Sequence, residues 1–146
     1  MNDQAQQTAQ GAHPAVGAPA AGHPGTYASH PIDPSAERGW GTITHVVPLV
    51  ATVASAGTLG FVGSLVIYLL YKDRGPFVRA NAANSLNIQI MTGIVLLVSF
   101  PLMLLLVGFL TYPLALVYAV VMHVIGAIKA NNGEWWDPPL TPHFVR

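Results

Sequence analysis

The chain has no cysteine among its 146 residues, and only 8% of those residues are charged. The absence of cysteine excludes disulfide bonds, thiolate metal sites and cysteine nucleophiles. The scarcity of charge excludes an ordinary soluble surface, because a typical soluble domain is about 25% charged. Six basic residues balance six acidic ones. The sequence therefore lacks the basic face that nucleic-acid binders need, and we expect no nucleic-acid partner.

Two long stretches contain no Asp, Glu, Lys or Arg. They are Gly41–Tyr71 and Ala80–Ile128, which are 31 and 49 residues long. About 20 apolar residues cross a bilayer as a helix, so the first stretch suffices for one crossing and the second for two. We therefore expect an all-α integral membrane protein, a small bundle of about three transmembrane helices, with residues 39–131 as the transmembrane domain.

The second stretch is expected to divide between Gly108 and Pro113. Glycine ends a helix readily, and proline fits the first turn of the next one, where no amide donor is needed. The division gives spans near Asn84–Val107 and Tyr112–Lys129. The short connection between them predicts an antiparallel pair.

The first stretch is too long for one upright helix. A helix over Thr42–Tyr71 would measure about 45 Å, whereas the hydrocarbon layer is about 30 Å thick. We expect a long first helix that is steeply tilted, projects into the headgroups, or breaks near Gly57–Gly63, where glycines recur every three residues.

Basic residues predict the orientation. Five of the six follow either the first span or the last one: Lys72, Arg74, Arg79, Lys129 and Arg146. Loops rich in Lys and Arg stay in the cytoplasm. Three crossings of a bacterial plasma membrane then place the N-terminus outside and the C-terminus inside, whereas four crossings would place both inside. With three crossings, His45 lies near the outer end of the first span and His123 near the inner end of the last.

The two tails differ from the apolar middle. Between Gly11 and Ala36, 16 of 26 residues are Gly, Pro or Ala, so we expect residues 1–38 to be a disordered tail. The spacing of its histidines matches no compact ligand set, which favours solvated linker residues over a loose metal-binding arm; these are His13, His23 and His30. Residues 132–146 are expected to form a cytoplasmic interfacial tail. Its Trp135 and Trp136 either anchor it to the membrane surface or form a docking epitope.

Several polar or small residues within the apolar stretches are candidates for helix packing or partner contact. Asn84, Asn87 and Gln89 are predicted to make interhelical hydrogen bonds, with a polar path or ligand site as the alternative. Small residues at four-residue spacing let helices approach closely. A ridge of this kind predicts packing within the chain or against a partner protein, and it consists of Ala56, Gly60 and Ser64.

His45 and His123 are the only imidazoles in the uncharged stretches. A proton relay would usually add an intramembrane Asp or Glu, and the stretches contain neither. Interfacial or bundle-facing packing of these rings is therefore favoured over a relay or metal role. We predict no cofactor and no metal site.

Two sequence clusters carry a family resemblance. The first begins at Leu69-Leu70-Tyr71-Lys72-Asp73-Arg74-Gly75-Pro76-Phe77-Val78 and continues through Asn81-Ala82-Ala83-Asn84-Ser85-Leu86-Asn87-Ile88-Gln89, and the second is Ala127-Ile128-Lys129-Ala130-Asn131-Asn132-Gly133-Glu134. Together they resemble the DUF4870 family of small bacterial membrane proteins, which is similar to the Tic20 component of chloroplast protein import. The resemblance covers about residues 38–140 and implies a helical membrane architecture. It departs from the family pattern at Asn81, usually His, and at Ile88, usually aromatic.

No catalytic motif is present in the sequence, neither a metalloprotease HExxH nor a phosphate-binding glycine loop nor paired carboxylates within the spans. We therefore expect a protein that is not an enzyme. The predicted function is a non-catalytic accessory or scaffold subunit, held in the lipid bilayer and associated with other membrane protein subunits as a hetero- or homo-oligomer. The alternative is a Tic20-like component of a translocation or transport assembly.

Overall fold

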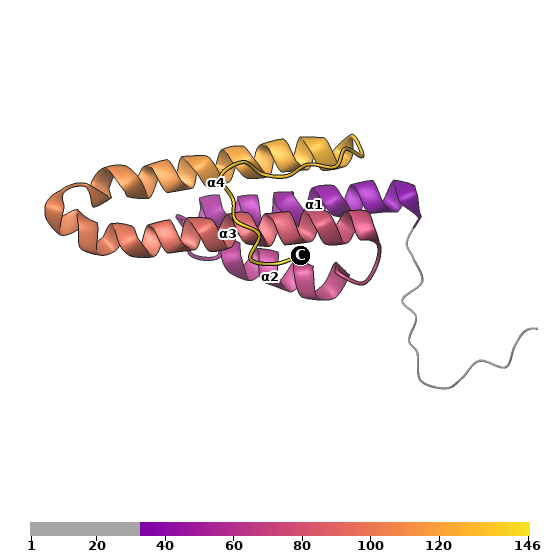
Figure 1. Cartoon of the computed structure of the whole chain (residues 1–146), viewed down its shortest axis with the longest axis horizontal. Coiled ribbons are helices and arrows are strands. Elements are labelled where there is room, and N and C mark those ends of the chain that lie inside the picture. The colour runs from indigo at the N-terminus through magenta and orange to yellow at the C-terminus, as the bar shows by residue number, and fades with distance from the viewer. Residues whose placement is uncertain (1–32) are drawn as a thin grey trace, which may run out of the picture.

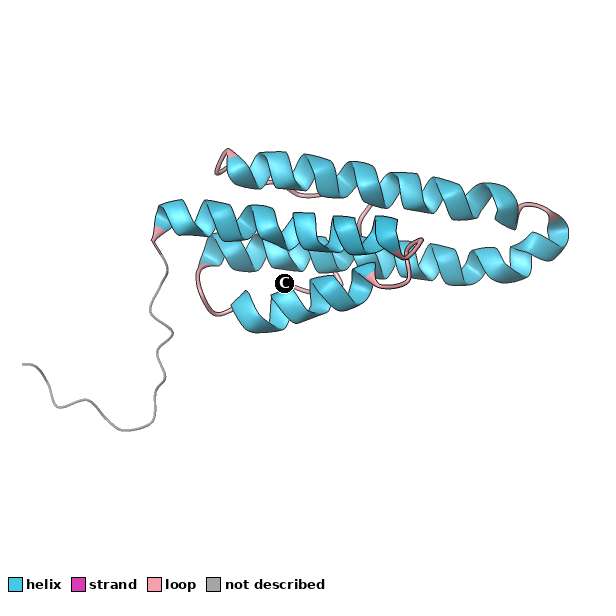
Figure 2. Ribbon diagram, turned by 180° about the vertical axis from the view of Figure 1, so that it is seen from behind, coloured by secondary structure: helices cyan, strands magenta, loops and turns pink. Residues whose placement is uncertain are grey.

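The computed structural model describes residues 33–146, and this part of the chain folds into four α-helices. They are α1 (Pro34–Ala54), α2 (Gly60–Tyr71), α3 (Pro76–Leu102) and α4 (Gly108–Asn131), and a short 3-10 turn η1 (Met103–Leu105) follows α3. Consecutive helices run in opposite directions (Figure 1). The described residues contain no strand (Figure 2), which confirms the all-helical prediction. The predictions for residues 1–32, including the three tail histidines, lie outside the described residues, whereas α1 already begins at Pro34, within the tail expected over residues 1–38.

Local chemistry fixes where α1 begins and ends. Asp33 caps its first turn by accepting a hydrogen bond from the Ser35 amide at 2.8 Å, and the bonds from Ser35 lower the pKa of the Asp33 carboxyl. The helix ends at a turn in which Ala56 and Gly57 take left-handed φ angles of 50° and 97°. A side chain at Gly57 would come within 2.7 Å of Leu96, so this turn needs glycine for both its conformation and its packing.

The first uncharged stretch is a hairpin rather than a single crossing. It breaks at residues 55–59, within the region where a break was expected, and α2 then returns alongside α1 (Figures 1 and 2). The rings of Trp40 and Tyr71 stack at 4.1 Å where the two helices meet again. Consequently the start of α1 lies at the same end of the bundle as the α2–α3 turn. The three-crossing prediction, which separated these two points by the bilayer, is not what the structure shows.

The second uncharged stretch divides as expected. It forms an antiparallel hairpin of α3 and α4, joined by η1 and by Leu106 at a φ of 64°. The segments Pro76–Leu105 and Gly108–Asn131 are the described helices long and apolar enough to cross a membrane, whereas α2 is apolar but has only 12 residues. By length and composition, two of the described helices could span a membrane, rather than the three that were expected. The α3–α4 hairpin also projects beyond the α1–α2 turn (Figure 1).

The interior is unusually polar and the exterior unusually apolar. Among the buried side chains, polar ones are as numerous as hydrophobic ones, whereas many leucines, valines and phenylalanines are exposed. Water-soluble proteins show the opposite tendency for fully buried residues. In lipid, polar side chains face the bundle interior, where they find partners. This arrangement suits a hydrocarbon solvent and positions the buried polar groups described next.

Candidate functional site

One face of α3 carries a stripe of buried polar side chains. Its members are three or four residues apart, the spacing that places side chains on one helical face. They are Asn81, Ser85, Gln89 and Thr92, and each is at most 5% exposed. These side chains face α1, α2 and α4, and their hydrogen bonds to those helices form a buried polar cluster.

Gln89 joins three helices. Its amide nitrogen donates to the Thr52 hydroxyl of α1 at 2.8 Å and lies 2.7 Å from Nε2 of His123 on α4. Gly60, the first residue of α2, makes this possible, because a Cβ there would lie 2.1 Å from the Thr52 hydroxyl and 2.5 Å from the Gln89 amide oxygen. A larger residue at position 60 would displace the amide.

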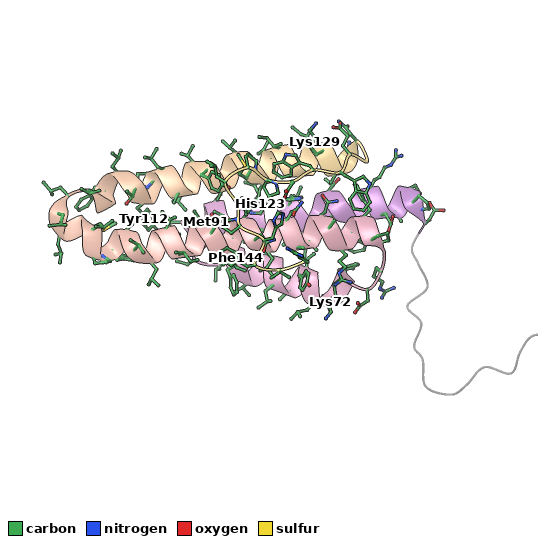
Figure 3. The ribbon with its side chains drawn as sticks, viewed as in Figure 1. Lys72, Met91, Tyr112, His123, Lys129 and Phe144 are labelled. Atoms are coloured by element: carbon green, nitrogen blue, oxygen red, sulfur yellow. The ribbon has the colours of Figure 1, made fainter. Side chains whose placement is uncertain are left out.

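His123 and His45 meet at the centre of the bundle. Their Nδ1 atoms are 3.3 Å apart, and both side chains are fully buried. His123 projects inward from α4 (Figure 3). Gly126 makes room for the second ring, because a Cβ at that position would lie 2.5–2.7 Å from the His45 imidazole. The Trp136 ring meets the His45 ring edge-on, with ring centroids 6.2 Å apart.

The tautomers of the two histidines are coupled. If the Gln89 amide donates to His123, then His123 carries its proton on Nδ1 and donates it to Nδ1 of His45. The His45 proton then sits on Nε2. The Asn81 side chain lies beside this ring, but no partner reaches hydrogen-bond geometry at Nε2, which is fully buried. An unpaired polar atom in this position is costly and calls for an explanation.

A second layer of hydroxyl bonds ties α2 to α3 and α1. The Ser85 hydroxyl donates to the Thr44 carbonyl of α1 at 2.6 Å, and it lies 2.9 Å from the hydroxyl of Ser64 on α2. All three side chains are buried. Together with the histidine pair, these bonds make the polar groups the main specific contacts between the helices.

The small-residue ridge lies inside the chain. Gly60 and Ser64 pack against α1 and α3 as just described. Ala56 is not on the helix; it belongs to the α1–α2 turn, where its carbonyl accepts a hydrogen bond from the Tyr112 hydroxyl at 2.7 Å. The structure thus uses these residues for internal packing.

Two of the predicted polar candidates hold the C-terminal segment rather than another helix. Residues 134–146 run back across α3 and α4, and we call them the C-terminal strap (Figures 1 and 3). Asn87 forms two bonds to the Val145 backbone, donating at 2.9 Å and accepting at 2.8 Å. Asn84 donates to the Trp136 carbonyl, and the Tyr118 hydroxyl donates to the Pro139 carbonyl at 2.8 Å. The bonds go to main-chain atoms, so they fix the path of the strap.

The two tryptophans of the strap have different surroundings. Trp135 is 66% exposed and meets the Phe77 ring edge-on, with centroids 5.3 Å apart. Trp136 is half-buried and packs on a small core cluster formed by Ile88, Ala119 and Met122. Trp135 therefore faces the surroundings of the bundle, whereas Trp136 helps to seal the histidine pair.

Charged groups gather near the end of the bundle that holds the start of α1, the α2–α3 turn and the end of α4, which we call the charged end. Lys72 and Lys129 both lie there (Figure 3). Lys129 pairs with Glu134 at 2.5 Å, and the hydrogen bond from Lys129, followed by one from Asn132, lowers the pKa of the Glu134 carboxyl. This pair closes the turn at Gly133, whose φ is 73°, and it starts the strap.

Sequence reasoning missed the contact between the two histidines and the roles of Thr52 and Gly126. It placed His45 and His123 toward opposite faces of the membrane, whereas they touch. It assigned no role to Thr52 or Gly126, although both shape the cluster. The polar period on α3, from Asn81 through Ser85 to Gln89, was a signal that could have identified a buried face.

The side chains of this cluster are buried and mostly bonded to one another, and they hold the helices together. Its groups are two imidazoles, carboxamides and hydroxyls. In residues 33–146, no group of three or more His, Cys, Asp or Glu side chains is placed to hold a metal ion.

Fold and site together define a class: a small all-helical protein with an apolar exterior, a polar interior and two helices suited to a membrane. The chain belongs to the magnetosome magnetite crystal formation protein family (MamF/MmsF), whose sequence profile matches residues 36–145. Searches of curated proteins and of solved structures gave no significant match. The profile match corrects the assignment to DUF4870, and nothing in the comparisons supports a Tic20-like protein.

Proposed function

We propose that this chain is a non-catalytic protein of the magnetosome membrane that contributes to magnetite crystal formation. The observation that carries the proposal is the family match, which covers residues 36–145, all but the ends of the helical bundle and the strap. The apolar exterior and the two long apolar helices support placement in a membrane. The polar cluster supports a binding or organising role, because its groups are engaged in holding four helices together.

The threading we propose differs from three crossings. Every Lys and Arg of the chain lies in the charged end or the strap, while Ala80–Ile128 contains none. The positive-inside tendency then places the start of α1, the α2–α3 turn and the end of α4 on the cytosolic side. The α3–α4 hairpin spans the hydrocarbon layer, and the shorter α1–α2 hairpin enters it from the same side.

Exposed side chains on the hairpins favour association with other membrane proteins. Trp135 and the apolar faces of α3 and α4 are available for such contacts. We propose that the chain acts as an accessory subunit of a larger membrane assembly. Crosslinking in intact cells followed by purification should recover specific membrane proteins, and recovery of the monomer alone in several detergents would contradict an accessory role.

Gene deletion in a magnetite-forming host tests the function directly. We expect altered magnetite crystals, seen by electron microscopy, and restoration by the unchanged gene. A variant carrying Gly126→Leu should not restore the crystals, whereas Gly93→Ala should, because a Cβ at Gly93 meets nothing within 4 Å. Normal crystals in the deletion strain would contradict the proposal.

A further inference from the structure

A cavity of about 260 Å³ lies between α3 and α4, near Met91 (Figure 3). Val95 of α3, Ala115 of α4 and Leu140 of the strap line it. Two lining residues, Leu114 and Leu140, are 56% and 84% exposed, so the cavity opens toward the surroundings of the bundle. An apolar cavity of about 150 Å³ already binds benzene, so this one has room for a segment of hydrocarbon chain. We propose that it holds one acyl chain of a membrane phospholipid.

The polar groups of the cavity wall are poorly placed to hold water. A water molecule inside a protein needs about two to four polar partners. The hydroxyl of Thr111 is already bonded to that of Ser99 at 2.7 Å, and the hydroxyl of Tyr118 donates to the Pro139 carbonyl at 2.8 Å. The Thr92 hydroxyl has no partner and almost no accessible surface. One buried hydroxyl is too few partners for an ordered water, which favours an apolar occupant.

The depth of the cavity decides which apolar molecule is available. Met91 lies 12 residues after Arg79, and Ala115 lies 14 residues before Lys129. At a rise of 1.5 Å per residue, the cavity is about 18–21 Å from these charged side chains, whereas the hydrocarbon layer is about 30 Å thick. In the threading proposed above, the cavity therefore opens among the acyl chains of the bilayer. The inference rests on that membrane placement.

Leu140 is held in an unfavourable conformation at the edge of the cavity. Its φ of 59° lies in the left-handed region, which a bulky side chain rarely adopts. Strained residues persist where the surrounding structure fixes them, and they cluster at functional sites such as ligand clamps. The Tyr118 hydroxyl fixes the preceding residue through the Pro139 carbonyl. Leu140 thus provides an apolar rim, and a chain lying in the cavity would cover part of its exposed surface.

Photochemical labelling of the full chain in phosphatidylcholine vesicles tests the site. The probe is a phosphatidylcholine that carries a diazirine in one acyl chain. We expect label on Val95 and on Ala115, which is 6% exposed and is reached only by a chain between the helices. Label is also expected at the tip, on Leu104–Leu106, which any surrounding lipid reaches. Label at the tip alone would overturn the site and leave the membrane placement intact, whereas absence of label from both would overturn the membrane placement and the site with it.

Three phenylalanine variants on one helix separate binding from folding. Ala115→Phe places a ring in the cavity and should abolish the retention of one phospholipid, measured by native mass spectrometry of the purified chain, without lowering the unfolding temperature. Val117→Phe adds the same ring at a 59% exposed position and should leave both unchanged. Ala119→Phe, fully buried against Ile88 and Met122, should lower the unfolding temperature by overpacking.

Leu140→Gly tests the rim without adding bulk. Glycine suits the left-handed conformation at this position, so the variant should stay folded and retain less phospholipid than the parent chain. Retention of the phospholipid by folded Ala115→Phe, or its equal loss from Val117→Phe, would overturn the site. A fall in the unfolding temperature of Ala115→Phe as large as that of Ala119→Phe would show that the space is not available, and would overturn it too.

Discussion

The two halves of the bundle are built on different principles. Near the charged end, four helices enclose hydrogen-bonded polar side chains, and the strap and ion pairs fix the helix ends. Toward the far end, only α3 and α4 continue (Figure 1), and their tip exposes Leu104, Leu105 and Leu106 at 69–89%. The first half specifies the fold through internal contacts. In the membrane setting proposed above, the second half depends on an apolar solvent around it.

This difference explains how a chain with 8% charged residues can hold one structure. Lipid provides little hydrophobic drive between helices, so small residues and hydrogen bonds determine which faces meet. Gly60 and Gly126 let the polar side chains of neighbouring helices approach. Near the tip, the hydroxyls of Ser99 and Thr111 lie 2.7 Å apart. Gly108 lets the start of α4 approach α3, because a Cβ there would lie 2.2 Å from the Ser99 carbonyl oxygen.

Matched leucine truncations should separate the two halves most clearly. Leu86 is 3% exposed, whereas Leu105 is 69% exposed. Leu86→Ala should lower the free energy of unfolding by about 2–5 kcal/mol, because it leaves a cavity. Leu105→Ala should change it by less than about 0.5 kcal/mol. Thermal or denaturant unfolding in one detergent measures both, and equal losses would contradict the comparison.

Filling the space around the histidine pair should have the next largest effect. Gly126→Leu places a side chain where the His45 ring lies, and overpacking of this kind costs about 1–3 kcal/mol or more. Gly93→Ala is the control, because its Cβ would be unopposed; it should raise stability by up to about 1 kcal/mol through helix propensity. If Gly126→Leu unfolded at the wild-type temperature, the close approach would not be needed.

Releasing the strap should cost somewhat less. Asn87→Ala removes both bonds to Val145, a loss of about 1–3 kcal/mol for a buried pair left unpaired. Amide hydrogen exchange should become faster in residues 134–146 while the helices stay protected. Asn131→Ala, at an exposed position, is the control. Unchanged exchange of the strap would show that the Asn87 bonds do not hold it.

Loss of the Lys129–Glu134 pair at the Gly133 turn should have the smallest effect on stability, and that effect should depend on pH. The pKa of Glu134 is lowered in the folded protein, chiefly by the hydrogen bond from Lys129. Its stabilisation is therefore complete above the unfolded-state value of 4.5 and is lost as the pH falls through the lowered folded value. The protection factors of the turn amides, which are corrected for the intrinsic pH dependence of exchange, should fall with acid in the parent protein. Glu134→Gln should remove this acid dependence.

Local and compositional features were predictable from the sequence. The charge-free stretches indicated the helical class, and Gly108 marked the division between α3 and α4. A break near Gly57 was also expected, but its consequence was not: a left-handed turn of two residues reverses the chain and turns one crossing into a hairpin. That reversal brings His45 next to His123, so the threading error also concealed the centre of the site.

The strap could not be predicted because its contacts carry no side-chain pattern. Asn84, Asn87 and Tyr118 bind backbone carbonyls and amides of the strap, which any residue would provide. Composition predicted only an interfacial tail. The polar faces of α3 were recognised as needing partners, but the choice between another helix and a returning segment depends on tertiary structure.

Side-specific labelling of single cysteines tests the central claim most directly, because the natural chain has none. Ala36→Cys probes the start of α1, and Arg74→Cys probes the α2–α3 turn; both positions are exposed. In sealed membranes whose outer face is accessible to an impermeant maleimide, the hairpin arrangement predicts that both cysteines are protected, and that both react once the membranes are opened. Reaction of the Ala36→Cys variant in sealed membranes, with protection of the Arg74→Cys variant, would contradict it.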